Sequence, residues 1–416
     1  AYGRVTQATD PLGNVATSTF TATTGRLLST MTVTTADPDG TGPAAKHVTT
    51  TTFDTRRGVA AKRVDPGGQI TEATYDALGR TPAVWRPGRS KASQTASETY
   101  SYAVSKTVPT AVTTQTLLPN GSSYRTTISL LDSYLRPRQE QTPGASAGRI
   151  VTDTRYDSRG NAVLVDRYYN ASAPATTLIQ PSNRADIPTS NRSHLDFAGR
   201  SVKEALYSAE TFKWETLTSY GGDRAKTTPP AGGTPTTVVS DYQGRTASLT
   251  QHLGTTPAAT GVTTTYSYDK AGNLAGMVDA KGNAWHYTYD LAGNKLTSDD
   301  PDKGLSTMTY NVAGQLLSST DARGVTLKYF YDNLGRPIKT TKADGTTLLT
   351  STTYDTVKPG LVSSSSRYLA GGTVTNQVNS YDTAGRPTSS STIVPAITGL
   401  IPTELAGTYT TTTSYN

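Results

Sequence analysis

The side chains best suited to chemistry in this sequence are aspartates, and they return at a fixed place in one short pattern. The stretch YTYDLAGNKL, residues 287–296, has Tyr-Asp followed by two variable residues, Gly and Asn. Its core recurs as YSYDKAGNL at 266–274, TYNVAGQLL at 309–317 and YFYDNLGRP at 329–337. Glycosidases need one pair of carboxylates at one site. Many equivalent aspartates in equivalent positions are the wrong distribution for that chemistry, so we predict no catalytic residue and no enzyme.

The best local candidate for a metal site is the acidic stretch SDDPDKG at 298–304, which has three aspartates in four positions. Calcium takes about six to eight oxygen ligands, typically from several closely spaced acidic residues. An acidic loop of this kind is more often simply solvated. We therefore predict no metal ligand.

Other candidate ligands are scattered along the chain. The glycine-rich stretches PGASAG at 143–148 and PPAGGT at 229–234 lack the Lys-Ser/Thr that a phosphate-binding loop requires, so no cofactor is predicted. The histidines do not show the HxxxH or HExxH spacing of a metal-binding helix and are expected at exposed loop or strand positions. They are His47, His194, His252 and His286.

The composition is typical of strands and turns. The 416 residues include 24 Tyr, 5 Phe, 3 Trp, 37 Gly and 23 Pro, and 34% of them are hydrophobic. Tyr and Thr suit a pleated surface, whereas Gly, Pro, Asp and Asn suit chain reversals. The low apolar content favours a sheet with one well-packed face over a thick core. Cysteine is absent, which excludes disulfides, thiol chemistry and Cys-based metal sites.

The charge pattern gives no sign of a nucleic-acid partner. The net charge of +7 is spread along the chain, and the basic stretches near Lys91 and Lys342 are dilute. No apolar run approaches the roughly 18–20 residues of a membrane helix, and no signal peptide opens the chain. Asn-x-Ser sequons carry no meaning in a bacterial protein and would mark surface loops in a eukaryotic secreted one. They lie at Asn120, Asn170 and Asn191.

The segments that contain these aspartates recur with a strict period. Tyr268, Tyr289, Tyr310 and Tyr331 are each 21 residues apart. A second turn signal lies halfway through each unit, so one unit reads strand, turn, strand, turn, with strands of about six residues. These half-unit turns are DAKGN (279–283), DPDKG (300–304) and DARGV (321–325), and DPLGN (10–14) and DPGGQ (65–69) resemble them.

Elsewhere the pattern is looser. It reappears as YDALGR (75–80), YDSRGN (156–161), LDFAGR (195–200), SDYQGR (240–245) and YDTAGR (381–386), with insertions in FDTRRG (53–58) and YDTVKPG (354–360). LDSYLR (131–136) has Leu135 where glycine belongs. Long intervening stretches such as residues 168–191 are predicted to be the most mobile parts, because they read as loop insertions.

We therefore predict one repeat array over residues 1–416. It divides into irregular repeats over 1–239, regular 21-residue repeats over 240–390 and the start of a further repeat over 391–416. The chain begins AYGRV and ends TSYN, and both read as halves of the pattern. The array is thus expected to be a segment of a longer polypeptide, cut inside a repeat at each end.

Each position of the pattern has a structural explanation. Tyr287 and Tyr289 are two residues apart, so both rings project from one face of a strand, and we expect a cross-strand ladder of such rings. The carboxylate of Asp290 would accept backbone N–H groups of the turn. Gly293 would take a positive φ, and Asn294 begins the return strand. Where Arg replaces this Asn, it would pair with the turn carboxylate.

The repeated Tyr-Asp-x-x-Gly-Arg/Asn pattern resembles the YD repeat of bacterial Rhs proteins, which are related to teneurins and to toxin-complex shell subunits. The resemblance covers nearly the whole chain and is strongest over 240–390. It implies an all-β fold in which the YD-repeat hairpins form a long, spiralling antiparallel sheet, either an Rhs-type shell or part of one. The family's self-cleavage aspartates and variable tail have no counterpart in these residues, so no catalytic residue is carried over.

The resemblance also implies a role as a secreted or cell-surface scaffold of a bacterium, enclosing or presenting a C-terminal effector or toxin domain. Two alternatives stay open. The chain is an adhesion module that binds cell-wall carbohydrate or a partner protein, with outward rings such as Tyr168 and Tyr169, or it self-associates through edge strands into filaments or tubes.

Overall fold

The computed structural model describes residues 3–22, 27–40 and 46–415, and every regular segment of any length in it is a strand. Thirty-two strands form one antiparallel sheet, in which each strand pairs with the next one along the chain. Single turns of 3-10 helix at η1 (Arg184–Asp186) and η2 (Thr403–Leu405) are the helices of the described residues. The predicted all-β meander is confirmed.

The strands have the bounds that follow: β1 (Gln7–Thr9), β2 (Val15–Ala22), β3 (Leu28–Thr34), β4 (Val48–Asp54), β5 (Val59–Val64), β6 (Ile70–Thr74), β7 (Ala83–Trp85), β8 (Glu98–Ala103), β9 (Thr110–Leu117), β10 (Tyr124–Leu131), β11 (Pro137–Pro143), β12 (Arg149–Tyr156), β13 (Ala162–Asn170), β14 (Thr189–Leu195), β15 (Ser201–Ser208), β16 (Thr211–Gly221), β17 (Arg224–Thr228), β18 (Thr236–Ser240), β19 (Thr246–His252), β20 (Gly261–Tyr268), β21 (Leu274–Val278), β22 (Ala284–Tyr289), β23 (Lys295–Asp300), β24 (Gly304–Tyr310), β25 (Leu316–Thr320), β26 (Thr326–Tyr331), β27 (Pro337–Lys342), β28 (Leu348–Tyr354), β29 (Val362–Leu369), β30 (Gly372–Tyr381), β31 (Pro387–Val394) and β32 (Gly407–Thr412).

The sheet has little conventional core. Most of its buried apolar side chains form two small clusters, one of Ala111, Ile128 and Leu130 and one centred on Val151 and Ile187. Most other strand residues are half-buried or exposed. Because so few large apolar groups are buried, the hairpin ladder and the turns carry much of the stabilisation.

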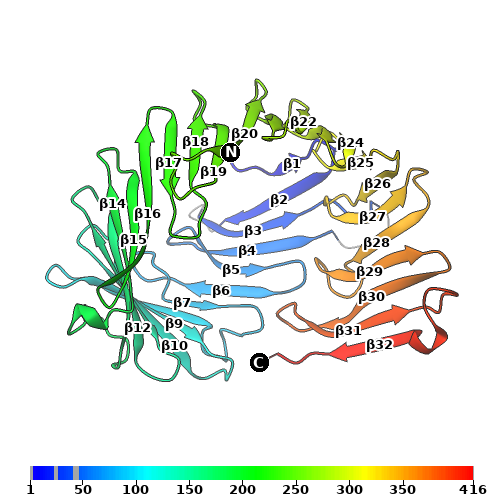
Figure 1. Ribbon diagram of the computed structural model, residues 1–416. Coiled ribbons are helices and arrows are strands. Elements are labelled where there is room, and N and C mark those ends of the chain that lie inside the picture. The colour runs from blue at the N-terminus through cyan, green and yellow to red at the C-terminus, as the bar shows by residue number, and fades with distance from the viewer. Residues whose placement is uncertain (1–2, 23–26, 41–45, 416) are drawn as a thin grey trace.

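The sheet curls into a spiral (Figure 1). In this view it runs from β1 down through the middle, up the left side, over the top and down the right side, where the last strands lie beside the first ones. The turn after β26 meets the turn after β3, that after β28 meets the one after β5, and that after β30 meets the one after β7. Each pair is 23 strands apart in the chain, so one winding takes 23 strands, and we call the line of contact the seam.

The meander sorts its turns onto two rims. Most turns that follow even-numbered strands contain the Tyr-Asp pattern, although those after β8 and β16 do not, and we call this edge of the sheet the YD rim. Turns that follow odd-numbered strands contain the half-unit signals, and we call that edge the half-unit rim. At the seam, the YD rim of the later strands lies on the half-unit rim of the earlier ones.

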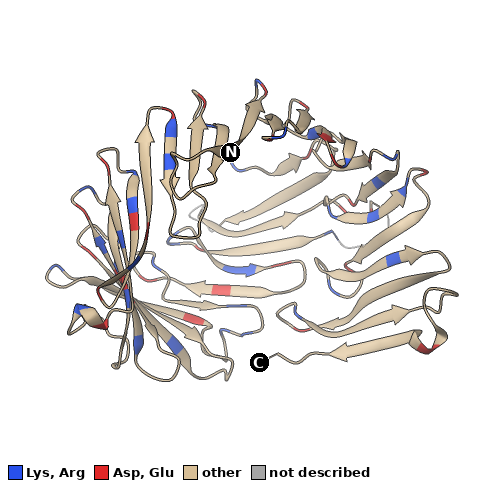
Figure 2. Ribbon diagram, viewed as in Figure 1, with Lys and Arg blue, Asp and Glu red and all other residues tan. Residues whose placement is uncertain are grey.

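Charged residues of both signs are dispersed along the sheet, without a tract of one sign (Figure 2). The dispersion matches the sequence-based expectation of a solvated surface. No helix in the described part of the chain has the length and apolar character needed to span a membrane.

Candidate functional site

The YD turns share one hydrogen-bond pattern, shown here by Asp290. Its Oδ1 accepts the backbone N–H groups of Ala292 and Asn294, each at 2.9 Å, and its Oδ2 accepts the Asn294 side-chain amide at 2.8 Å. The backbone N–H of Gly293 donates to the Asp290 carbonyl at 3.1 Å. Gly293 has φ 85°, and the strand pairing slips by one residue at Tyr289. This is a tight turn closed by a bulge.

The carboxylate of this turn is fully used by its own hairpin. The Asn294 side chain and the backbone N–H groups around it hold the pKa of Asp290 below its usual value. The half-unit aspartates Asp10 and Asp279 make the same bonds to their own Asn. Hydrogen bonds that favour the charged form keep these groups ionised, which is the opposite of what a general acid needs.

Gly293→Val is expected to lower the stability of the β22–β23 hairpin by about 1–2 kcal/mol, because a side chain disfavours the left-handed conformation. Space is not the obstacle, since the nearest atom to an added Cβ is 3.9 Å away. Limited proteolysis should show new cleavage within residues 287–296. The matched control is Ala292→Val, an exposed neighbour in the same turn, which should leave the digestion pattern unchanged. Identical patterns for both variants would contradict the turn assignment.

The turn at 132–136 forms the same structure without its glycine. Leu135 has φ 61° and donates its N–H to the Asp132 carbonyl at 2.9 Å. Leu135→Gly is expected to stabilise the protein by about 0.5–1 kcal/mol, because it relieves a strained backbone at the cost of extra freedom in the unfolded chain. Thermal unfolding should show a rise in Tm. Leu78→Gly, in a turn whose Leu does not have positive φ, is the control and should lower Tm.

An arginine at the last position of the pattern links one YD turn to the next. In the turn at 241–245, Arg245 donates from its backbone and Nε to Asp241, at 2.9 and 2.7 Å. Its guanidinium lies 4.3 Å from the ring centre of Tyr268, the tyrosine of the next unit. The Tyr268 hydroxyl donates to the Thr246 carbonyl at 2.8 Å. Arg136, Arg200, Arg336 and Arg386 make the same link to Tyr156, Tyr220, Tyr354 and Tyr415.

The expected ladder of stacked tyrosines is therefore wrong. Tyr287 and Tyr289 do share a face, but each packs against the Lys295 ammonium, at 4.2 and 6.0 Å. Tyrosines of successive units are two strands apart, about 9.5 Å, which exceeds the ring contact distance of about 4.5–7 Å. Arg245 and Lys295, at the start of two intervening strands, each place a cation against a ring, whereas β21 and β25 contain no Lys or Arg.

The seam gathers a cluster of charged groups from distant parts of the chain. Arg336 donates from Nε to Asp332 at 2.6 Å and from its two terminal nitrogens to Asp355 at 3.2 and 2.6 Å. His47, from the first winding, is buried and lies 3.0 Å from the Asp355 carboxylate. Burial works against the charged form of Asp355, but the bonds from Arg336 and the N–H of Gly360 lower its pKa. The cluster fastens one winding to the other.

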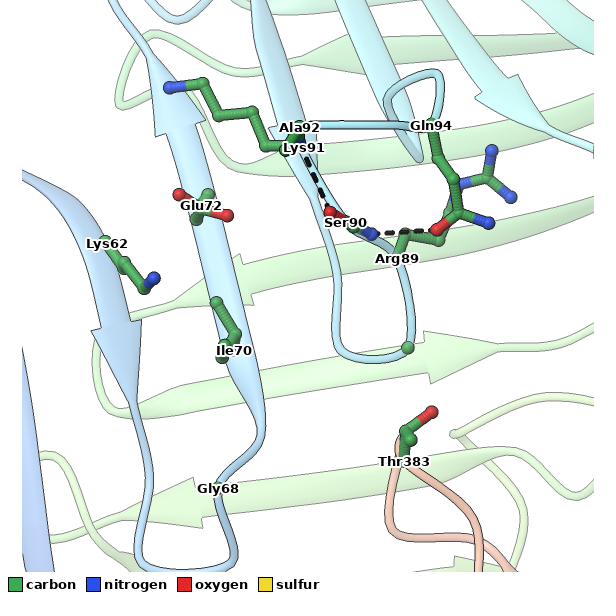
Figure 3. Close-up of a pocket in the computed structure, with 11 residues that line it drawn as sticks. Lys62, Gly68, Ile70, Glu72, Arg89, Ser90, Lys91, Ala92, Gln94 and Thr383 are labelled. Atoms are coloured by element: carbon green, nitrogen blue, oxygen red, sulfur yellow. Dashed lines mark hydrogen bonds between the residues drawn. The ribbon is translucent and has the colours of Figure 1, made fainter.

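Several pockets lie beside the seam, and two of them differ in their lining. One, of about 780 Å³, is lined by side chains of the first winding together with Thr383 of the later strands, and Figure 3 shows Glu72 between Lys62 and Lys91 at its wall. The other, of about 610 Å³, is lined by Pro38, Tyr331, Arg336 and their neighbours. Both pockets result from the winding, and neither brings a nucleophile together with a base.

The segment 171–188, within the stretch predicted to be mobile, is hydrogen-bonded to the sheet. Gln141 is fully buried, donates to the Thr177 carbonyl at 2.9 Å and accepts the Ala175 N–H at 2.9 Å. Gln139 makes the equivalent pair of bonds to Ile179. The segment covers β11–β13, because buried amide side chains there satisfy its backbone.

The same covering corrects the expectation of two outward rings. Tyr168 is only 3% exposed and donates its hydroxyl to the Ile179 carbonyl at 3.0 Å, whereas Tyr169 is 58% exposed. Both lie in β13, where successive side chains point to opposite faces. Only Tyr169 is available at the surface.

Gln141→Leu is expected to destabilise the protein by about 2–4 kcal/mol, because it leaves several buried polar partners of the covering segment unsatisfied. The guanidinium of Arg149 loses its 2.6 Å bond as well. Urea unfolding and proteolysis within 171–188 measure the effect. Gln251→Leu, at an exposed strand position, is the control and should be nearly neutral. Equal, small losses in both would show that the segment is not clamped.

The histidines and the acidic stretch can now be placed. His194 and His286 are exposed as expected, but His47 and His252 are buried, the latter bonded to Thr237 and to the Ala259 carbonyl. In the stretch 298–304, Asp300 accepts the N–H groups of Asp302 and Lys303. Across the described residues, no three His, Asp or Glu side chains converge as a metal site would need. The prediction of no site residues stays a prediction.

These features define a class of protein: a spiral β-sheet built from hairpin repeats whose turns are closed by Asp and tied together by Arg and Tyr. Residues 241–284, 268–304 and 310–347 match the RHS Repeat family model. Residues 241–304 and 310–347 thus carry RHS repeats, within the part of the chain where the sequence pattern is most regular.

Solved structures share the fold across nearly the whole chain. A crystal structure of TcdB2-TccC3 matches 99% of it with 14% identity and a TM-score of 0.72, and one of TcdB2-TccC3-TEV matches 98% with 14% identity and a TM-score of 0.75. The Photorhabdus luminescens Tc holotoxin pore matches 96%, with 13% identity and a TM-score of 0.72. The chain spans about a quarter of the length of each, 26%, 27% and 25%. No protein of curated function matches it in sequence.

Proposed function

We propose that this chain is a non-enzymatic wall segment of a large secreted or cell-surface Rhs-repeat protein, and that the wall encloses or presents a C-terminal effector. The observation that carries the proposal is the seam, where turns 23 strands apart lie on one another. A sheet whose later strands pack against its own earlier winding forms a continuous curved wall. A binding module or an enzyme does not need such a wall.

The turn chemistry supports a structural role. The carboxylate oxygens of the repeated aspartates accept hydrogen bonds from the N–H groups of their own turns. These side chains therefore stabilise hairpins and are not presented to a substrate. The likeness to structures of TcdB2-TccC3 and of a Tc holotoxin pore supports a toxin-related wall. Since the chain spans about a quarter of those structures, enclosure of an effector would need more sheet than these residues provide.

Electron microscopy of the 416-residue chain tests the proposal. We expect an open, curved wall around a solvent-filled space, with a scattering profile to match. A compact solid particle would contradict the wall. A loss of curvature in a seam variant such as Asp355→Asn, with the hairpins intact by circular dichroism, would show that the seam sets the shape.

A second candidate is adhesion to a cell-wall glycan, and it is favoured by exposed rings at the YD turns. Phe197 is 96% exposed and Tyr242 is 92% exposed, and aromatic faces stack on sugar rings. A glycan-array signal that is lost in Tyr242→Ser would support this function. An array without signal would contradict adhesion and leave the wall function unaffected.

A further inference from the structure

One pocket beside the seam is lined by charged groups that do not neutralise one another. It has a volume of about 780 Å³, its cations are Lys62, Arg89 and Lys91, and its carboxylate belongs to Glu72. Figure 3 shows Glu72 between the two lysines, without a hydrogen bond to either of them. In the described part of the chain, neither lysine has an ion-pair partner. The pocket therefore differs from the closed cluster around Arg336, because its charged groups are available to a ligand.

The strand register places these groups in one row. Lys62 of β5 lies opposite Glu72 of β6, and Glu72 lies opposite Trp85 of β7. Residues directly opposite one another share a face of the sheet. The ammonium of Lys91 lies 5.6 Å from the centre of the Trp85 ring. Two ammonium groups, a carboxylate and an indole ring are thus gathered on one side of the sheet.

The loop after β7 is held in place by its own hydrogen bonds. The Trp85 indole N–H donates to the Gln94 carbonyl at 3.0 Å, and the Ser90 N–H donates to the Gln94 side chain at 2.8 Å. Arg89 donates from Nε and from one terminal nitrogen to Thr95, at 2.9 Å each. Its other terminal nitrogen has no partner in the described part of the chain. Because this donor is already positioned, it can bind an anion with little loss of conformational entropy.

The later winding completes the pocket from the other side. Thr383, in the turn after β30, faces the loop after β7 (Figure 3). The Thr383 hydroxyl oxygen would lie 3.4 Å from a Cβ on Gly88. The pocket therefore exists where the two windings meet, and a ligand inside it would contact both.

We propose that this pocket binds an acidic saccharide, whose carboxylate or phosphate group contacts the three cations while its hydroxyl groups donate to Glu72. Both kinds of charge-assisted hydrogen bond are needed to account for the lining, because Glu72 repels a simple anion. The same carboxylate interrupts the basic groove and the row of stacking rings that a nucleic-acid strand requires. The site is separate from the exposed rings of the YD turns. It does not depend on an enclosed effector, so its failure would leave the proposed wall function unaffected.

Isothermal titration calorimetry of the 416-residue chain tests the ligand class. Glucuronate and glucose 6-phosphate present the two acidic groups on a sugar, glucose presents hydroxyl groups alone, and acetate and inorganic phosphate present charge alone. We expect one or both acidic sugars to bind about ten-fold more tightly than glucose and than the matching free anion, because each half of the site adds hydrogen bonds to a charged group. Equal affinity for the free anion, tighter binding of decathymidylate, or no binding of either acidic sugar would each overturn the proposal.

Variants of the charged row separate the two halves of the site. Lys62→Gln should weaken binding of the acidic sugar about ten-fold. Lys226→Gln, at an exposed position of β17 that does not line the pocket, is the control and should leave binding unchanged. Glu72→Gln should reduce the preference for the acidic sugar over the free anion, because it removes both the hydroxyl acceptor and the repulsion of anions. An unchanged preference, or equal losses in the two lysine variants, would contradict the site.

Hydrogen exchange tests whether both windings take part. A saturating concentration of the acidic sugar should slow exchange in residues 88–94 and also in residues 382–386, because Thr383 lines the pocket. Protection of residues 88–94 alone would place the ligand on one winding and overturn a site made by the seam.

Discussion

Arg336→Ala is expected to lower the free energy of unfolding by about 3 kcal/mol, because it removes one cation from between two partly buried carboxylates. The guanidinium lies 2.6 Å from both Asp332 and Asp355 and 4.3 Å from the ring centre of Tyr354. Asp332 is only 6% exposed at its side chain, so water does little to replace the lost partner. Urea unfolding measures the loss.

Arg245→Ala is the matched control. Arg245 makes the same bonds to Asp241 and the same contact with Tyr268, but its turn is not part of the seam. We expect a loss of about 1 kcal/mol there, the usual size of an accessible ion pair. Hydrogen exchange should rise around residues 46–50 and 355–361 only in the Arg336 variant, because His47 meets Asp355 at that place. Equal losses and equal exchange would mean that the seam adds no stability.

Acid is expected to unfold this protein steeply, with stability falling between about pH 4 and pH 2 as the turn aspartates take up protons. Burial opposes the shift, but the hydrogen bonds of the turns outweigh it and hold the pKa of fifteen described aspartates below its usual value. For Asp344 the side chain and N–H of Thr347 lower the pKa to about 2.

The sign follows from the direction of these shifts. A group whose pKa is lower in the folded chain contributes stability above its unfolded pKa, and that stability is lost as the pH falls through the folded pKa. The unfolding free energy should therefore be nearly constant above pH 5 and drop with a slope that reflects many protons at once.

Urea unfolding at a series of pH values measures this slope. The chain contains its own control turn, because Asn311 occupies the Asp position in one YD unit and makes the same bond to the following N–H. Asp290→Asn and Asp269→Asn copy that turn, and together they should reduce the slope without breaking the hairpins. A stability that is flat from pH 5 to pH 2.5 would show that the turn carboxylates do not hold the fold.

The local parts of this structure were predictable because their causes lie within a few residues. The bonds of Asp290 to Ala292 and Asn294 and the positive φ of Gly293 follow from the order Asp-x-x-Gly-Asn. The pairing of Arg with the turn carboxylate follows in the same way. Leu135 adopts the positive φ of the same turn, although it stands where the pattern has glycine.

The contacts between distant residues were not predictable in this way. His47 looked like an exposed histidine, and its partner Asp355 is 308 residues away. The segment 171–188 read as a loose insertion, although two buried glutamines in β11 bind its backbone. The tyrosines were expected to stack on each other, but Tyr268 and Tyr287 pack against the cations of Arg245 and Lys295 instead.

The sequence by itself therefore determined the strands, the turns, their alternation along the chain and the RHS repeats of residues 241–347. Each of these depends on spacings of 2 to about 21 residues, and turn geometry and the pleat act over that range. Only the tertiary structure decided where the windings meet. Curvature accumulates over many strands from small twists between neighbours, so the 23-strand step and the pairing of His47 with Asp355 depend on the whole sheet rather than on any stretch of the chain.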